Sequence, residues 1–294
     1  MRAQLASQSD LFPVDLFHVD PVQAALAQTV HRRERRSGSR VYARVTVGGL
    51  RTACVSRHQL GAVMVGDCLA ARGGKRVPKL VFASNGHAIA MSALDSKFRT
   101  QFAQADLIHA DGEPVVFASK LFSKTPVPER SATTDFLFDA AHVARDAGLK
   151  FFLLGSSEAV NARAVEKLQQ DYPGIEIVGR RNGYFRREDE AEICDAINAS
   201  GADVLWVGLG VPFEYEFSLR NKSRLNVGWV VTCGGCFNFA AGDYVRAPEW
   251  MQKNGLEWAF RLWREPRRLF WRYLITNPVA IAMLALKTGA RFAS

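Results

Sequence analysis

The sequence predicts an α/β protein with a Rossmann-like, mostly parallel sheet and a basic, aromatic C-terminal appendage. Three observations lead to this prediction. Short apolar runs recur along the chain, segments with helical spacing separate them, and each run stops at a glycine or a polar residue. The 294 residues are 48% hydrophobic, enough for one large domain with a sizeable core plus an appendage.

Six apolar runs are predicted to be strands of this sheet. They cover residues 80–83, 105–110, 150–154, 174–178, 203–207 and 227–232. Alternation with helices of about 10 to 15 residues favours right-handed crossovers and parallel strands buried on both faces. Ligands bind outside the carboxyl ends of such strands. The ends of the runs carry Asn85, Asp111, Gly155, Gly208, Gly210 and Gly235. We expect the ligand-binding and catalytic site to lie there.

The chain divides into three predicted parts: a partly disordered N-terminal extension (1–50), an α/β domain (51–254) and the appendage (255–294). The extension holds a basic stretch, 31–40, typical of a solvated arm or of a contact with acidic lipid. No signal peptide opens the chain, and no apolar run reaches the roughly 18 to 20 residues of a spanning helix. We therefore expect a cytoplasmic protein with reduced thiols that meets a membrane only at its surface.

The net charge of +9 implies an anionic partner: a nucleic acid, a phosphorylated small molecule or an acidic membrane surface. The tail is the most unusual segment. Residues 258–273 interleave aromatic residues with five arginines, and Pro266 is expected to begin a new helix. Such a pattern suits a helix at a lipid–water interface. A surface helix packed on the core and a nucleic-acid patch are the alternatives.

Two glycine loops are candidate ligand contacts. Residues 208–213 carry two glycines of a dinucleotide fingerprint but lack the third, and no acidic residue follows in the right relation. A tight turn beneath a phosphate or sugar fits as well. Residues 155–158 open a helix, with Ser157 as a plausible N-cap. The same helix end could instead face a diphosphate.

Metal and redox chemistry have weak support in the sequence. Cys233 and Cys236 form a CxxC without a second pair or paired histidines, so a tight loop explains them better than a metal or redox site. No Asp-x-Asp triplet is present, so arginines and amides are expected to meet a diphosphate. Asp111 and Glu113 lie together at a strand end. They are either carboxylates that face solvent in a loop, or one of them is a general base that takes the proton of an attacking hydroxyl.

Five groups of residues, in this order and spacing, resemble the WecG/TagA/CpsF glycosyltransferases over about residues 62–278. They are 110–112; 129–130 with 134–135; 152–155; 172–179 with 182–185; and 234–237 with Gly242, continuing into 246–250, 255–258, Arg261 and 265–267. The closing run is far more specific than either glycine loop.

The resemblance implies an inverting, metal-independent enzyme without a cofactor. It would move a hexose-type sugar (N-acetylmannosamine, its uronic acid or the glucose class) from a UDP-sugar to a polyprenyl-diphosphate-linked saccharide. The product would be an exopolysaccharide, capsule, adhesin or cell-wall polymer. The appendage would associate with the anionic inner face of the plasma membrane, and nucleic acid would not be a partner. The sequence does not fix the oligomeric state. A homo-oligomer and contacts with other polysaccharide-synthesis enzymes are the partners considered.

The resemblance also assigns roles to individual residues. Asp111 matches the proposed base, and Arg130 matches an arginine near the diphosphate. The donor-site positions are Asn85, Gly183, Tyr184, Gly210, Glu214 and Asn238. Arg261 and Arg268 match appendage arginines that close over the active site.

Three departures concern the donor. Ala83 replaces a threonine, Glu214 stands where the family has an amide, and Asn238 stands where aspartate is common. The alternative function is a non-catalytic basic module that binds membrane or nucleic acid. A nicotinamide-dependent oxidoreductase is disfavoured, because the sequence lacks the third glycine of the fingerprint and the acidic residue that binds the ribose.

Overall fold

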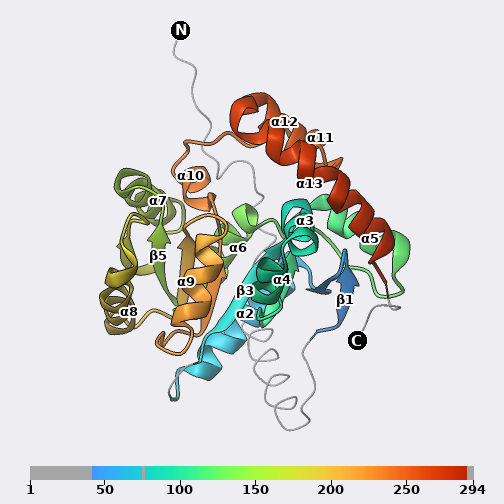
Figure 1. The fold of residues 1–294 in the computed structure, drawn as a ribbon. Coiled ribbons are helices and arrows are strands. Elements are labelled where there is room, and N and C mark those ends of the chain that lie inside the picture. The colour runs from blue at the N-terminus through green and yellow to red at the C-terminus, as the bar shows by residue number, and fades with distance from the viewer. Residues whose placement is uncertain (1–41, 75–76, 290–294) are drawn as a thin grey trace.

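The central sheet has six parallel strands in the order β4-β3-β8-β7-β5-β6 (Figure 1). The computed structural model describes residues 42–74 and 77–289. The strands are β3 (Lys79–Ser84), β4 (Leu107–Ala110), β5 (Lys150–Gly155), β6 (Glu176–Arg181), β7 (Val204–Gly208) and β8 (Trp229–Thr232). Each lies on one of the six predicted runs, so the predicted parallel α/β fold is confirmed.

The apolar runs are continuous because the inner strands are buried on both faces. Successive residues of a strand point to opposite faces. On β7, Leu205 and Val207 accordingly enter one hydrophobic core, while Val204 and Trp206 enter the other. The edge strand β6 is largely exposed or half-buried, and its sequence is correspondingly polar.

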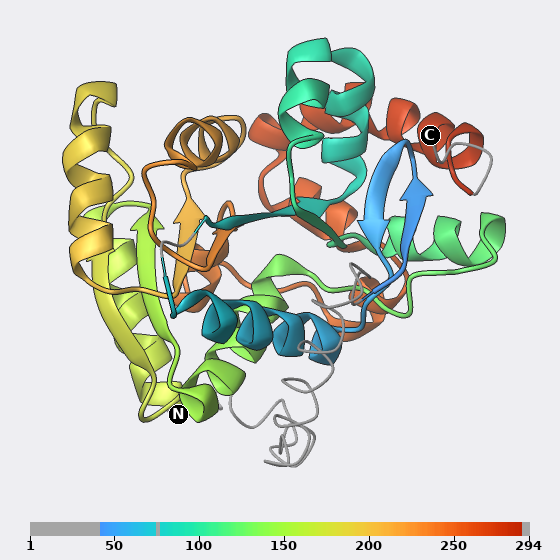
Figure 2. The same ribbon diagram turned by 90° about the horizontal axis from the view of Figure 1, so that it is seen from below.

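Two layers of helices cover the sheet, and Figure 2 shows α2 and the α3–α4 pair on its opposite sides. One layer contains α2 (Arg57–Ala71), α6 (Thr133–Ala147), α7 (Glu158–Asp171) and α10 (Cys236–Ala240). The other contains α3 (Gly86–Leu94), α4 (Ser96–Phe102), α5 (Glu113–Phe122), α8 (Glu190–Ala199) and α9 (Phe213–Asn221). A short 3-10 turn, η3 (Arg187–Asp189), precedes α8.

Side-chain caps explain where several helices begin. At the start of α2, the Ser56 hydroxyl accepts a hydrogen bond from the Gln59 backbone amide. The Gln59 side-chain oxygen in turn accepts from the Ser56 backbone amide. Asn85 caps α3, and Ser157 caps α7 through the Val160 amide at 3.3 Å. The N-cap predicted for Ser157 is thus confirmed.

A two-stranded hairpin precedes the sheet and was not predicted from the sequence. Strands β1 (Arg44–Val47) and β2 (Leu50–Ala53) pair antiparallel across Gly48 and Gly49, whose φ angles are 58° and 88°. Such a tight turn needs positive φ, which glycine adopts without strain. The division drawn at residue 50 separates β1 from most of β2, although the two strands pair, so this boundary cuts through the hairpin. The basic stretch 31–40 lies outside the described residues.

The C-terminal segment forms α11 (Glu249–Lys253), α12 (Glu257–Arg264) and α13 (Pro266–Leu286). They lie across one end of the domain, with α13 alongside α3 (Figure 1). Pro266 occupies the first turn of α13, as predicted. The buried side of α13 includes Leu269, Thr276, Ala280 and Leu284.

The described chain contains one helix that could cross a membrane by length and composition alone. It is the stretch Leu269–Leu286 of α13, with 18 residues, a mean hydropathy of 1.4 and 22% of the window buried. The expectation that no segment reaches this length is therefore wrong. Arg272 interrupts the apolar run in the sequence, but the helix as a whole stays apolar on average.

Candidate active site

The carboxyl ends of the strands gather most of the predicted site residues. Asn85 follows β3, Asp111 follows β4, and Gly155 and Gly208 end the neighbouring strands β5 and β7. Because all six strands are parallel, these positions meet along one edge of the sheet.

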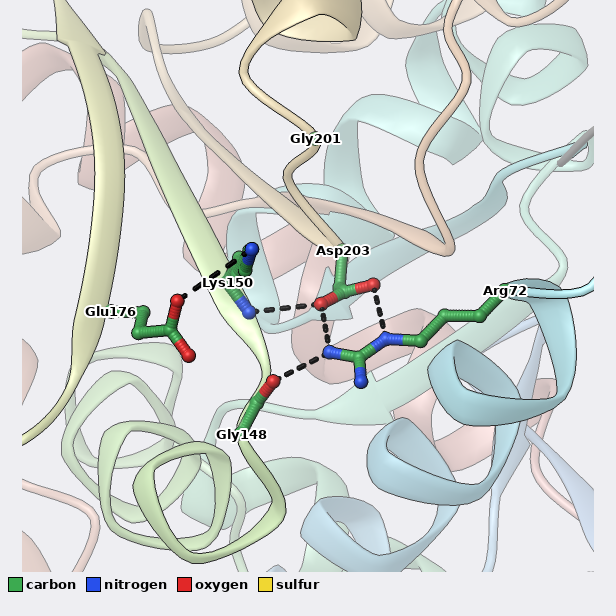
Figure 3. A pocket seen from close by; sticks show the side chains of 6 residues that line it. All are labelled: Arg72, Gly148, Lys150, Glu176, Gly201 and Asp203. Carbon is green, nitrogen blue, oxygen red and sulfur yellow. Dashed lines mark hydrogen bonds and ion pairs between the residues drawn. The ribbon is translucent and has the colours of Figure 1, made fainter.

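The opposite edge holds a polar pocket of about 320 Å³ (Figure 3). Its charged groups are engaged with one another: Arg72 Nη2 lies 2.6 Å from Asp203 Oδ2, and Lys150 Nζ lies 3.7 Å from Glu176 Oε2. The Asp203 carboxylate also accepts from the Lys150 amide at 2.9 Å. These bonds tie the beginnings of β5 and β7 together, so we regard this pocket as structural.

Asp111 accepts hydrogen bonds from two residues, Asn85 and Thr133. The Asn85 side-chain amide donates to Asp111 Oδ2 at 2.9 Å, and the Thr133 backbone amide donates to Oδ1 at 2.7 Å. The Asn85 amide group is itself oriented, because its oxygen accepts from the Ala88 amide at 3.0 Å in capping α3. Thr133 is the first residue of α6, whose positive dipole end favours a carboxylate. The Thr133 hydroxyl lies 3.5 Å from the same oxygen, Oδ1, so Oδ2 is the oxygen that retains a lone-pair direction for a proton.

A buried histidine fixes the segment that carries Thr133. His109 is fully buried on β4, with Nδ1 2.8 Å from the Ser131 carbonyl oxygen. The Ser131 amide donates to the Ala110 carbonyl at 2.7 Å, which fastens this loop to the end of β4. Burial lowers the pKa of His109 and keeps its ring neutral. His109 was not predicted, although a histidine in an apolar strand two residues before Asp111 was the available signal.

Arg130 joins the α/β domain to the appendage. Its guanidinium lies 2.8 Å from Glu257 Oε2 on α12, 3.1 Å from Gln252 Oε1 on α11 and 3.4 Å from Asp135 Oδ2 on α6. The side chain is 14% exposed. A diphosphate at Arg130 would have to compete with these partners.

Arg246 completes this network. It pairs with Asp135, and its Nη2 donates to Gln252 Oε1 at 2.7 Å. Burial alone would raise the pKa of Asp135, but the Arg246 guanidinium holds it below its usual value. Arg246, Gln252 and Glu257 were not among the predicted site residues. Arg246 and Glu257 lie in the closing run of motifs, which was the signal for them, whereas Gln252 lies between its segments 246–250 and 255–258.

Glu214 is buried between the loops that follow β7 and β8. Its Oε2 accepts from the Gly210 amide at 3.1 Å and from the Gly234 amide at 2.9 Å. Burial raises the pKa of Glu214 to about 7 against these two donors, and the nearby Asp111 carboxylate contributes in the same direction. The structure thus brings two predicted site residues, Glu214 and Gly210, into direct contact.

The loops after β5 and β6 meet at Ser156. Ser156 has a φ of 58°, and its hydroxyl donates to Asn238 Oδ1 at 3.3 Å. The Gly183 amide donates to the Ser156 carbonyl at 2.8 Å. A Cβ on Gly183 would lie 3.1 Å from the Gly155 Cα, so this approach needs glycine.

The predicted nucleotide contacts surround this loop pair. Asn238 and Gly183 both bond to Ser156, whereas the Tyr184 side chain is 81% exposed. Arg261 of α12 lies over the Phe239 ring, with 5.5 Å from Cζ to the ring centroid. Arg268 lies in the first turn of α13, and its side chain is outside the described residues.

Cys233, directly after β8, and Cys236, the first residue of α10, are buried free thiols. Burial raises the pKa of Cys233 well above its ordinary value, which keeps it a thiol and disfavours metal binding. In residues 42–74 and 77–289, no three His, Cys, Asp or Glu side chains come together as a group able to hold a metal ion.

The model of the Glycosyl transferase WecG/TagA/CpsF family matches residues 45–292. The chain belongs to this family of glycosyltransferases. An N-acetylglucosaminyldiphosphoundecaprenol N-acetyl-beta-D-mannosaminyltransferase of Bacillus spizizenii is 33% identical over 182 residues, 62% of this chain and 69% of the relative. The enzyme of the same name from Bacillus subtilis strain 168 is 29% identical over 191 residues, 65% and 73% of the two chains.

Proposed function

We propose that this family member is an inverting, metal-independent transferase that moves a hexose-type sugar from a UDP-sugar to a polyprenyl-diphosphate-linked saccharide. The acceptor class is supported by the names of the two Bacillus relatives, whose acceptor is an undecaprenol-linked diphosphosaccharide. The donor stays within N-acetylmannosamine, its uronic acid and the glucose class, because Glu214 and Asn238 depart from the family pattern.

The observation that carries the mechanism is the positioned Asp111 carboxylate. In a single displacement, the acceptor hydroxyl attacks the anomeric carbon on the face opposite the leaving UDP. Asp111 takes the hydroxyl proton as the bond forms, and the configuration inverts. A base of this kind contributes roughly 10²–10⁴-fold. Asn85 and Thr133 hold the carboxylate still, so little reorganisation is needed.

The leaving diphosphate needs positive charge, which we assign to arginines rather than to a metal. Arg130 and Arg246 converge on Asp135 and Gln252, and Arg261 lies over the ring of Phe239, the residue after Asn238. Arg268 is proposed as a further appendage contact. Charge-assisted bonds from guanidinium groups suit phosphate oxygens.

We assign the appendage to the anionic inner face of the plasma membrane. An apolar pocket of about 260 Å³ lies between α12 and α13, with Trp258, Phe270 and Tyr273 among its lining residues. One side of α13 is docked against α3, with Ala280 beside Gly86. A helix held this way along its length lies in the interface plane rather than across the bilayer.

The test is transfer from a panel of UDP-sugars to a polyprenyl-diphosphate-linked acceptor by wild type and Asp111→Asn. The asparagine keeps the shape and removes proton affinity. We expect turnover to fall roughly 10²–10⁴-fold, with UDP binding little changed. Near-normal turnover by Asp111→Asn would exclude Asp111 as the base, and no transfer with any donor would overturn the proposed reaction.

A further inference from the structure

Helix α5 has apolar side chains on two faces. Its inward face packs into the core through Val115, Val116 and Ala118. Its outward face presents Phe117, 67% exposed, and Leu121, 61% exposed. A surface helix normally shows one apolar stripe, so a second stripe facing solvent indicates an apolar partner.

The neighbouring helix α13 also exposes apolar side chains. Helix α5 contacts α13, and both views place it beside the C-terminal half of that helix (Figures 1 and 2). The chain after α13 passes close to the end of α5, where a Cβ on Gly289 would lie 2.6 Å from the Phe122 carbonyl oxygen. The large exposed apolar side chains of α13 are Phe270, Trp271, Leu274, Ile275, Ile281 and Leu286. Two helices that are remote in sequence but contact each other therefore both expose apolar side chains, with Ile281 and Leu286 in the half of α13 beside α5.

Apart from Glu113 at the start of α5 and Glu265 before α13, the charges along these two helices are positive. Residues 114–126 contain Lys120 and Lys124 and no acidic residue, and residues 266–289 contain three arginines, Lys287 and no acidic residue. Lys120, Lys124 and Lys287 are exposed. Apolar side chains flanked by lysine and arginine fit an anionic bilayer, where the headgroups attract the bases and the interface takes the apolar groups.

We propose that α5 is a second lipid-contacting helix, which enters the interface of an anionic bilayer through Phe117 and Leu121 beside the outer face of α13. This inference rests on the proposed function, which supplies a membrane-bound acceptor. It goes further, because α5 belongs to the α/β domain and begins two residues after Asp111.

Docking of α5 would bring the active site close to the bilayer. Helix α5 begins at Glu113, and Phe117 follows Asp111 by only six residues. Interfacial helices bury their apolar face about 5–10 Å into the headgroup boundary. Asp111 would therefore lie near the membrane surface, where a diphosphate-linked sugar is held.

The test uses a double variant that carries both Phe117→Ser and Leu121→Ser. Its control is the single variant Val77→Ser. Val77 is 68% exposed and lies two residues before β3, at the opposite edge of the sheet. We expect the double variant to bind phosphatidylglycerol-containing vesicles about 10- to 100-fold more weakly, from the apolar area of two side chains. Val77→Ser should bind like wild type. Transfer to a soluble short-chain acceptor should be unchanged in both variants.

Three outcomes would overturn the inference. Equal vesicle binding by wild type and the double variant would leave α13 as the lipid contact and exclude α5. A dimer that the double variant dissolves, with vesicle binding unchanged, would mean that a second copy covers α5. Loss of transfer to the soluble acceptor would mean that α5 acts on the Asp111 loop. Absence of transfer by wild type would refute the proposed function, while vesicle binding would still decide the role of α5.

Discussion

Replacing Glu214 by glutamine should change how stability depends on pH. The folded pKa of Glu214 is raised to about 7 from an ordinary 4.5, mainly by burial. The folded protein therefore holds this proton more tightly than the unfolded chain does. The stability contributed by the group is fully present below about pH 4.5 and is lost as pH rises through about 7. A difference of this size corresponds to about 3 kcal/mol.

Glutamine has the same shape, stays neutral, and its oxygen can accept from both Gly210 and Gly234. Relative to wild type, the unfolding free energy of Glu214→Gln should rise by about 2–3 kcal/mol between about pH 5 and about pH 8, measured by urea denaturation. Glu216→Gln is the matched control on the same helix. The hydrogen bond from Lys97 lowers the pKa of Glu216, so its contribution is lost on acidification instead. Parallel pH profiles for wild type and Glu214→Gln would refute the reasoning.

Three further predictions concern the loops and the tail. Gly155→Ala should lower the unfolding free energy by about 2–4 kcal/mol, because φ is 141° and a Cβ would lie 2.2 Å from a backbone oxygen of β7. Gly201→Ala, with φ at 69° and no atom within 4 Å, should cost about 1 kcal/mol in the same denaturation assay. Transfer activity should survive excess chelator, and it should survive Cys233→Ser combined with Cys236→Ser; recovery by added metal after chelation would contradict this. Truncation after Gly255 should release the protein from anionic vesicles and abolish transfer, even to a soluble acceptor.

The strands could be predicted because their burial leaves a simple pattern. Residues 204–207 read Val-Leu-Trp-Val, and every one of them is buried. The hairpin left a weaker pattern, because its strands Arg44–Val47 and Leu50–Ala53 are only four residues long and bury Thr46 and Thr52 among their apolar residues. The Gly48-Gly49 pair between two short runs was the signal for it.

The site divides in the same way between local and long-range contacts. Asn85 and Asp111 follow β3 and β4, which are neighbours in the sheet, so their hydrogen bond follows from topology. The Arg130 contact with Glu257 joins residues 127 positions apart. Residue spacing cannot predict such a contact, because it depends on how α12 folds back over the domain.

That long-range contact links the appendage to the proposed base. Glu257 holds Arg130, and the backbone amide of Thr133, three residues further on, holds Asp111. Without α12, the Arg130 guanidinium would lose a carboxylate partner while still facing Arg246 across Asp135. Removing one partner from a largely buried ion-pair network costs more than the pair itself contributes, because the remaining charge stays desolvated. Truncation after Gly255 is therefore expected to abolish transfer to a soluble acceptor as well as vesicle binding, because the segment that positions Asp111 would shift.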